Sequence, residues 1–218
     1  MGSELPVDVT VEERLEELRR TPRCGDDLGN PVDTTGGLID LVQEVRPRRV
    51  LELGGDRGVS TEVFLLLCEE VVVVDPWDDF PDISFEFDHI EGDDAKTDFM
   101  NMRAGRSQQF LDRNGGYPNL TVIRDYSPNA QVAMAEKYTG YFDLVYVDAV
   151  HEEQPVIDDV RASWPLVSKG GWMAGHDYVL GDGEANRVIP AVDHLFGKGN
   201  VKVFNDSSWL IRRPDMQP

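Results

Sequence analysis

Two short runs in the second half of the sequence each place an acid close to a histidine. Asp148 is followed by His151, and His176 directly precedes Asp177. Each pair follows an apolar run typical of a buried strand, so both pairs are expected where strands end. Carboxylate oxygens suit a hard divalent cation such as Mg²⁺, and a histidine can accept a proton near neutral pH. The runs therefore predict a cation site with a base beside it; the alternative is that the acids only cap loops.

A second candidate site lies in residues 50–60, where an apolar strand leads into a glycine-rich turn. The three glycines are Gly54, Gly55 and Gly58. An apolar helix is expected over residues 61–68, with Ser60 as its N-cap. Glycine permits sharp turns and close approach of a ligand, and the free N–H groups of a helix start favour ligand oxygens. Asp75 ends the next strand, about where nucleotide-binding α/β units carry the acid that binds ribose hydroxyls.

The spacing of these glycines does not favour a dinucleotide. The dinucleotide pattern G-x-G-x-x-G, counted from Gly54, would need glycines where the chain has Asp56 and Val59. Glu52 also lies at the end of the first strand, where a pyrophosphate would be repelled. The simpler alternative is a helix-packing turn and a strand-end acid, as found in any α/β protein.

Five apolar runs, each followed by a connection with a helical pattern, are the elements that would position these side chains. They cover residues 50–53, 71–74, 120–123, 142–147 and 172–175. Two more short strands, residues 201–204 and 209–212, are joined by a turn and are expected to form a hairpin. The order predicts a Rossmann-like α/β sheet of five parallel strands plus a C-terminal antiparallel hairpin, with helices on both faces.

The motifs resemble those of a known enzyme family. The run E-x-G-G-x-x-G from Glu52 to Gly58 resembles motif I of the class I S-adenosylmethionine (SAM) methyltransferases. The runs FDLVYVDAVH (142–151) and KGGWMAGHDY (169–178) look like the metal-dependent O-methyltransferases of the macrolide-sugar and rhamnosyl type, and the similarity extends over residues 36–212. The sequence departs from that branch at Val150, where relatives carry a second Asp, and at His176, where many carry Asp or Asn.

The resemblance implies a function and a role for each candidate residue. It implies SAM as cofactor, bound by Glu52, Gly54, Gly55, Gly58, Asp75 and Ser127. It implies Mg²⁺ or another divalent cation, bound by Asp148, His176 and Asp177, with His151 as the base. The reaction would methylate a hydroxyl of a small, polyhydroxylated, sugar-like acceptor. Two alternatives stay open: a metal-free SAM-dependent transferase acting on N or O, and a SAM- or nucleotide-binding protein without catalysis.

The length of 218 residues predicts a single domain with an ample core. Residues 1–47 would form N-terminal helices. Residues 76–118 are the longest irregular stretch and a candidate lid or acceptor-binding insertion, with a helix expected over residues 96–113. Relatives often assemble through such elements, so a homo-oligomer is an open expectation.

The charge balance excludes some partners. The net charge is −20, from 41 acidic and 21 basic residues, which disfavours a nucleic acid because phosphate binding depends on Lys and Arg. An acidic, lysine-poor surface also suits a cytoplasm rich in salt; the alternative is an ordinary acidic enzyme. Cys24 and Cys68 show no paired spacing, and no apolar run reaches the roughly 20 residues that span a membrane. A cytoplasmic location without membrane partners is expected.

Overall fold

The computed structural model describes residues 9–23, 34–77, 105–178 and 187–214. Within these residues one seven-stranded sheet forms, in the order β3-β2-β1-β4-β5-β7-β6. Its strands are β1 (Arg49–Leu53), β2 (Glu70–Val74), β3 (Leu120–Ile123), β4 (Phe142–Val147), β5 (Val167–Gly175), β6 (Lys202–Val203) and β7 (Trp209–Arg212). β1 to β5 pair in parallel, and β7 is antiparallel to both β5 and β6. The expected fold class is confirmed, including the C-terminal hairpin.

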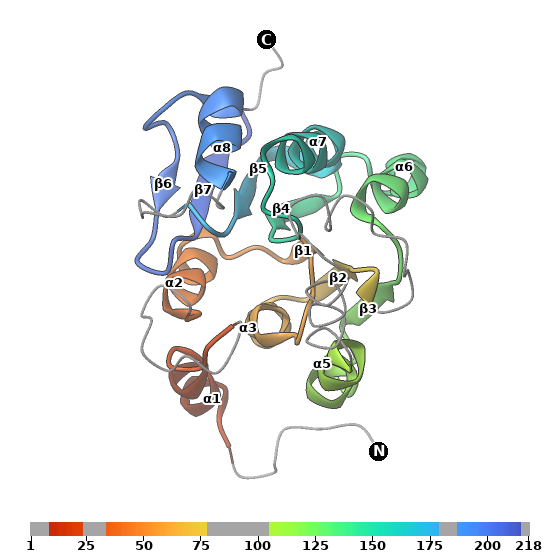
Figure 1. Ribbon diagram of the computed structural model, residues 1–218. Coiled ribbons are helices and arrows are strands. Elements are labelled where there is room, and N and C mark those ends of the chain that lie inside the picture. Colours follow the sequence, from red (N-terminus) through yellow and green to blue (C-terminus); the bar gives the residue numbers. More distant parts are fainter. Residues whose placement is uncertain (1–8, 24–33, 78–104, 179–186, 215–218) are drawn as a thin grey trace, which may run out of the picture.

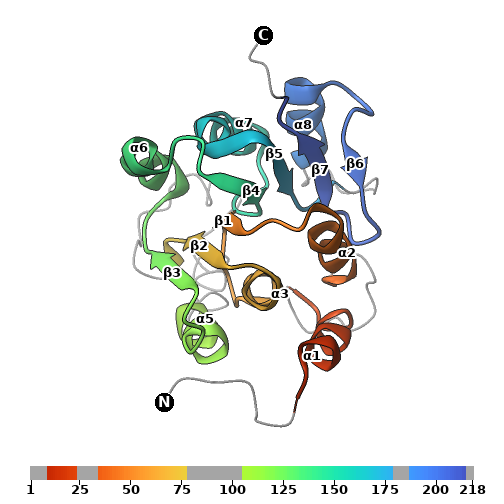
Figure 2. The same cartoon turned by 180° about the vertical axis from the view of Figure 1, so that it is seen from behind.

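Helices cover both faces of this sheet, as Figures 1 and 2 show from opposite sides. One face carries α1 (Val11–Leu18), α2 (Gly36–Val45), α3 (Val59–Leu67) and α5 (Arg106–Asn114). The other carries α6 (Ser127–Tyr138), α7 (Glu153–Ser163) with the short 3₁₀ helix η4 (Trp164–Leu166), and α8 (Val188–Phe196). No helix in the described ranges is both long and apolar enough to cross a membrane.

The central strands are buried on both faces, which explains their nearly continuous apolar sequences. Successive side chains of a strand point to opposite faces. Leu51 and Leu53 of β1 therefore join the core beneath α6, α7 and α8, while Val50 joins the core beneath α2 and α3. Glu52 shares the face of Val50, and this parity directs its carboxylate towards α3.

Two helix starts differ from the sequence prediction. α3 begins at Val59, with Gly58 as its N-cap residue in the left-handed region (φ 79°), so Ser60 is inside the helix and is not its cap. The positive φ of Gly58 lets the chain enter the helix two residues earlier than a serine cap would. α5 begins at Arg106, after Gly105. Residues 96–104 of the helix expected over 96–113, and most of the expected insertion, lie outside the described residues.

The C-terminal hairpin holds the start of α2. Asp206, in the turn between β6 and β7, accepts a hydrogen bond from the backbone N–H of Leu38 (2.7 Å) and another from that of Ser208 (2.9 Å). Thr35 occupies the N-cap position of α2, but its hydroxyl donates to the carbonyl of Leu18 (2.6 Å) instead of capping the helix. A carboxylate distant in sequence therefore accepts one of the free N–H groups in the first turn of α2.

Candidate active site at the carboxyl edge of the sheet

The hydrogen-bond ladder continues one residue past the strands and aligns the functional groups. Gly54 N–H donates to Val74 O (2.9 Å), and Asp148 N–H donates to Leu53 O (2.8 Å). His176 N–H likewise donates to Val147 O (3.2 Å). The ends of β1, β2, β4 and β5 thus lie side by side, at the edge where open α/β sheets bind ligands.

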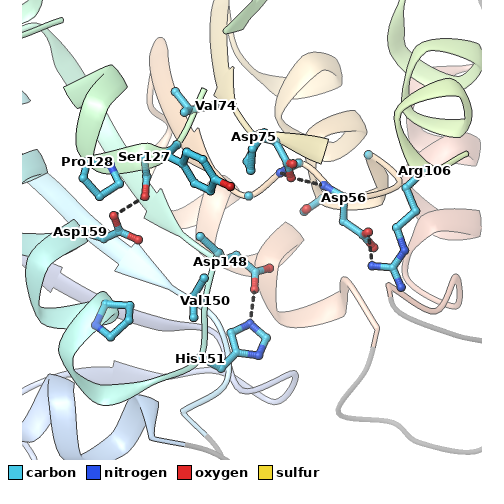
Figure 3. Close-up of a pocket in the computed structure, with 18 of the residues that line it drawn as sticks. Asp56, Val74, Asp75, Arg106, Ser127, Pro128, Asp148, Val150, His151 and Asp159 are labelled. Carbon is cyan, nitrogen blue, oxygen red and sulfur yellow. Dashed lines mark hydrogen bonds and ion pairs between the residues drawn. The ribbon is translucent and has the colours of Figure 1, made fainter. Parts of the chain in front are cut away.

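A cavity of about 560 Å³ opens at this edge. Its lining includes seven of the residues predicted from sequence: Gly54, Gly55, Gly58, Asp75, Ser127, Asp148 and His151. Figure 3 shows how several of these side chains converge from different strand ends. Glu52, His176 and Asp177 are not among the described residues that line it.

The glycine turn is shaped by contacts within the protein. Gly54 has φ 92°, and a Cβ there would lie 2.0 Å from the carbonyl oxygen of Asp148. Gly58 has φ 79°, and its Cβ would lie 1.9 Å from the Asn114 side-chain nitrogen. Both positions therefore require glycine for their backbone conformation and for close packing.

Asp75 supports this turn directly. Its Oδ2 accepts hydrogen bonds from the backbone N–H groups of Gly55 (2.7 Å) and Asp56 (2.9 Å), and its Oδ1 accepts one from Trp77 (2.7 Å). The side chain is buried, so these charge-assisted bonds are strong ones. Asp75 also lines the cavity, and its role in binding a ribose stays a prediction.

Glu52 lies beneath the cavity wall instead of facing the cavity. It is fully buried, and its Oε2 accepts a hydrogen bond from the Thr61 hydroxyl of α3 (2.5 Å). Burial raises the pKa of Glu52 to about 8, against the hydrogen bonds from Thr61 and Ser60 that lower it. Glu52 does not line the cavity, and its predicted role in binding SAM stays a prediction.

Asp148, His151 and Asp177 form a compact cluster. One potential ligand atom from each lies within 4.8 Å of the others. His151 Nε2 is 3.5 Å from Asp148 Oδ1 and 3.1 Å from Asp177 Oδ2. Burial would raise the pKa of both acids, but the neighbouring histidines, and the charge of Arg23, outweigh it and lower both pKa values. The two carboxylates are therefore ionised and ready to bind a cation or a protonated ring.

His176, predicted from sequence as a metal ligand, lies beside this cluster and not within it, and its role as a ligand stays a prediction. Its ring is buried, and its Nε2 lies 2.6 Å from the carbonyl oxygen of Asp206. Its Nδ1 is 3.3 Å from Asp177 Oδ1, so the ring supports that carboxylate from the side of the β6–β7 turn. The Asp206 carbonyl therefore occupies one ring nitrogen of His176, and His151 is the histidine grouped with the two carboxylates.

Arg23 is a cavity residue that no sequence pattern had marked. Its side chain is buried, with Nη1 3.0 Å from Asp148 Oδ2 and Nη2 donating to the Tyr146 hydroxyl (2.9 Å). It precedes Asp148 by 125 residues, in a stretch without helical or strand periodicity. Only the fold reveals the pair.

The family of the chain follows from a comparison with known proteins. A family model described as a methyltransferase domain matches residues 51–178, a span from β1 past the end of β5. The chain belongs to this methyltransferase family. The match confirms the enzyme class expected from sequence, a SAM-dependent methyltransferase. No curated protein matches the chain.

Solved structures share the fold of this methyltransferase at low sequence identity. Cofactor-bound Rv0187 from MTB has a TM-score of 0.56 and 14% identity, covering 95% of this chain and 88% of its own. The O-methyltransferase from Bacillus cereus in complex with SAH has a TM-score of 0.50 and 17% identity, covering 96% and 93%. CalS11, a TDP-rhamnose 3'-O-methyltransferase of calicheamicin biosynthesis, has a TM-score of 0.50 and 14% identity, covering 93% and 92%.

Two polar pairs complete the cavity wall of the methyltransferase, and both are drawn in Figure 3. The Ser127 hydroxyl donates to Asp159 Oδ1 (2.5 Å) at the start of α6. Burial raises the pKa of Asp159 to about 6, above the ordinary value of 3.8. Across the cavity, Arg106 of α5 donates to Asp56 of the glycine turn (2.5 Å). Asp159 and Arg106 were not predicted from sequence, because the residues that flank each of them in the sequence form no recognisable motif.

Proposed function

We propose that this methyltransferase transfers the methyl group of SAM to a hydroxyl of a small, sugar-like acceptor, beside a divalent cation. One observation carries the proposal: the cluster of Asp148, His151 and Asp177 adjoins the cavity that the glycine turn lines. Transfer of a methyl group to a hydroxyl needs a site for the cofactor and acid–base groups close to it. The glycine turn and the cluster offer both at one edge of the sheet.

The cofactor would occupy the side of the cavity formed by the ends of β1, β2 and β3. SAM supplies an electrophilic methyl group on its sulfonium. Asp75 would accept the ribose hydroxyls, and Ser127 would lie beside the adenine. The Bacillus cereus neighbour was solved with SAH, which supports SAM as the cofactor.

The cluster fits a divalent cation by the chemistry of its donors. Two carboxylates of lowered pKa and one imidazole lie within 4.8 Å of one another, and carboxylates are preferred ligands of Mg²⁺. Asp148 and Asp177 would hold the cation, which when bound would lower the pKa of an acceptor hydroxyl.

His151 is proposed as the base that accepts the hydroxyl proton. Its side chain is 46% exposed, so an acceptor can reach the ring, and the two carboxylates hold it in place. The acceptor is proposed as sugar-like because the sequence resembles the sugar O-methyltransferases and because CalS11 shares the fold.

A second candidate is a metal-free transfer to O or N. One observation favours it: within the described residues, each of the four carboxylate oxygens of Asp148 and Asp177 already has a nitrogen of Arg23, His151 or His176 within 3.5 Å. A histidine oriented by carboxylates can act as a base without a cation.

A turnover assay over a panel of sugars and sugar nucleotides tests the proposal. With SAM present, we expect methyl transfer that EDTA abolishes and excess Mg²⁺ or Mn²⁺ restores. Asp177→Asn should also abolish it, whereas Asp158→Asn, in an exposed acid of the same cavity wall, should not. Full activity in EDTA would favour the metal-free candidate. SAM binding with no product across the panel would contradict the proposed reaction.

The role of His151 is tested by its own variant. His151→Ala should lower kcat by about 10²–10⁴-fold, the usual contribution of a general base, and leave the SAM dissociation constant unchanged. His194→Ala is the matched control, because His194 lies exposed on α8. Wild-type turnover of the His151 variant from pH 6 to pH 9 would remove it from this role.

A further inference from the structure

Arg23 places a permanent positive charge against the acid cluster. Only 5% of the residue is exposed, and its guanidinium lies 3.0 Å from Asp148 Oδ2. The neighbours of Arg23 hold it in this position. The Tyr146 hydroxyl accepts from Nη2, lies 3.0 Å from Ser208 Oγ, and belongs to a ring that packs edge-on against Phe64. The guanidinium is therefore held by Asp148 and by Tyr146 of β4, and Ser208 of the β6–β7 turn holds the Tyr146 hydroxyl in turn.

Arg23 differs in kind from the other basic groups of the cluster. His151 and His176 can each exist as neutral rings, whereas an arginine side chain does not lose its proton in a protein. Asp148 thus has a partner that stays charged at every pH. A divalent cation that approaches Asp148 meets this charge at close range, in a site of low solvent exposure where charges are poorly screened.

We propose that Arg23 is a positioning residue that fixes the Asp148 carboxylate and, as a resident charge, lowers the affinity of the cluster for a divalent cation. This inference rests on the cation site of the proposed function. It gives the ion pair of Arg23 and Asp148 a role beyond structure, because occupancy of the cluster then depends on how firmly the guanidinium holds one of its carboxylates.

Mn²⁺ binding, followed by electron paramagnetic resonance without SAM or acceptor, tests the inference. R23Q removes the charge and keeps a planar donor, so Mn²⁺ should bind about tenfold more tightly than in the wild type. R23K keeps the charge and should stay within about threefold of wild type. R113Q is the matched control: it changes the net charge equally, but Arg113 pairs with Glu62 of α3, outside the cluster, and should leave the affinity unchanged.

The outcomes separate this inference from the proposed function. Equal or weaker Mn²⁺ binding by R23Q would overturn the role of Arg23 and leave the cation site standing. No Mn²⁺ binding by any of the proteins would overturn both. Absence of methyl transfer over the acceptor panel would contradict the proposed reaction without changing the Mn²⁺ result.

A measurement on the wild-type protein covers the case in which R23Q does not fold. The side-chain Nε–Hε resonance of Arg23 would be followed by NMR during titration with Mg²⁺. We expect this resonance to shift as the cation draws Asp148 Oδ2 away from the guanidinium. A resonance that stays fixed while Asp177 signals move would overturn the inference.

Discussion

Asp75 combines two tasks in one buried carboxylate. It accepts three backbone N–H groups, from Gly55, Asp56 and Trp77, and it also lines the cavity where the ribose is proposed to bind. A carboxylate is suited to both tasks, because its two oxygens offer about four acceptor positions. The acid that would bind the cofactor therefore also holds the turn on which the cofactor would lie.

Asp75→Ala is expected to weaken both binding and stability. The loss of SAM affinity should be about 1–3 kcal/mol, the scale of leaving a polar group unpaired, and the free energy of unfolding should fall by at least as much. Calorimetry measures the first and urea unfolding the second. A stability loss with unchanged SAM affinity would limit Asp75 to a structural role.

Glu52 predicts a pH dependence of stability. Its folded pKa of about 8 lies above the ordinary value of 4.5, so the unfolded chain loses the proton at lower pH than the folded one. Stability from this group therefore falls as pH rises from about 4.5 to about 8. Glu52→Gln cannot ionise, so its stability relative to wild type should increase between pH 5 and pH 8, by on the order of a few kcal/mol.

Urea unfolding at pH 5, 6.5 and 8 measures this difference. Glu136→Gln on α6 is the matched control, because Glu136 is exposed, and its stability relative to wild type should not change with pH. A constant difference between Glu52→Gln and wild type would show that Glu52 is ionised in the folded protein throughout this range.

At the scale of elements, α2 depends on the hairpin that closes the chain. Asp206 is buried and accepts the backbone N–H groups of Leu38 and Ser208. Asp206→Ala should lower the free energy of unfolding by about 2–4 kcal/mol, because both donors would stay buried without this acceptor. Thermal unfolding checks it, with Asp112→Ala on the exposed side of α5 as control. Equal melting temperatures for the two variants would show that the hydrogen bonds of Asp206 do not stabilise the start of α2.

The order of the elements could be predicted because their apolar runs are local signals. The five parallel strands and the hairpin of β6 and β7 lie where the sequence predicted them, within one or two residues at their ends, except that β5 begins at Val167 and not at residue 172. The predicted start of α3 was wrong because Gly58, in the left-handed conformation, is the N-cap residue. The residue types around Gly58 do not determine its backbone angles. The sequence also could not predict which face of the sheet the Glu52 side chain points to, because strands that are buried on both faces lack an alternating apolar and polar pattern.

The candidate site was predictable only where its residues follow strands. Asp148 and His151 lie in the loop after β4 and Asp177 lies in the loop after β5, and they meet because parallel strands end at one edge. Arg23 and Asp206 act on partners 125 and 168 residues away, which no local pattern encodes. His176 has a ligand-like position in the sequence, but its ring is bound by the carbonyl of Asp206.

At the scale of the whole molecule, the net charge of −20 predicts a response to salt. Acidic groups repel one another in the folded state, and salt screens this repulsion. The melting temperature should therefore rise from low to molar KCl, with sorbitol of equal osmolality as the control for effects other than screening. A flat or falling melting temperature in KCl would reject adaptation to high salt and leave the enzyme class unaffected.

The contact between Gly54 and Asp148 sets a fixed spacing across the proposed active site. The space beside the Gly54 Cα leaves no room for a methyl group, since a Cβ would lie 2.0 Å from the Asp148 carbonyl oxygen. The turn proposed to hold the methyl donor and the strand end proposed to hold the cation therefore meet backbone to backbone. A side chain at position 54 would force these two segments apart, and with them the proposed positions of the methyl donor and the cation.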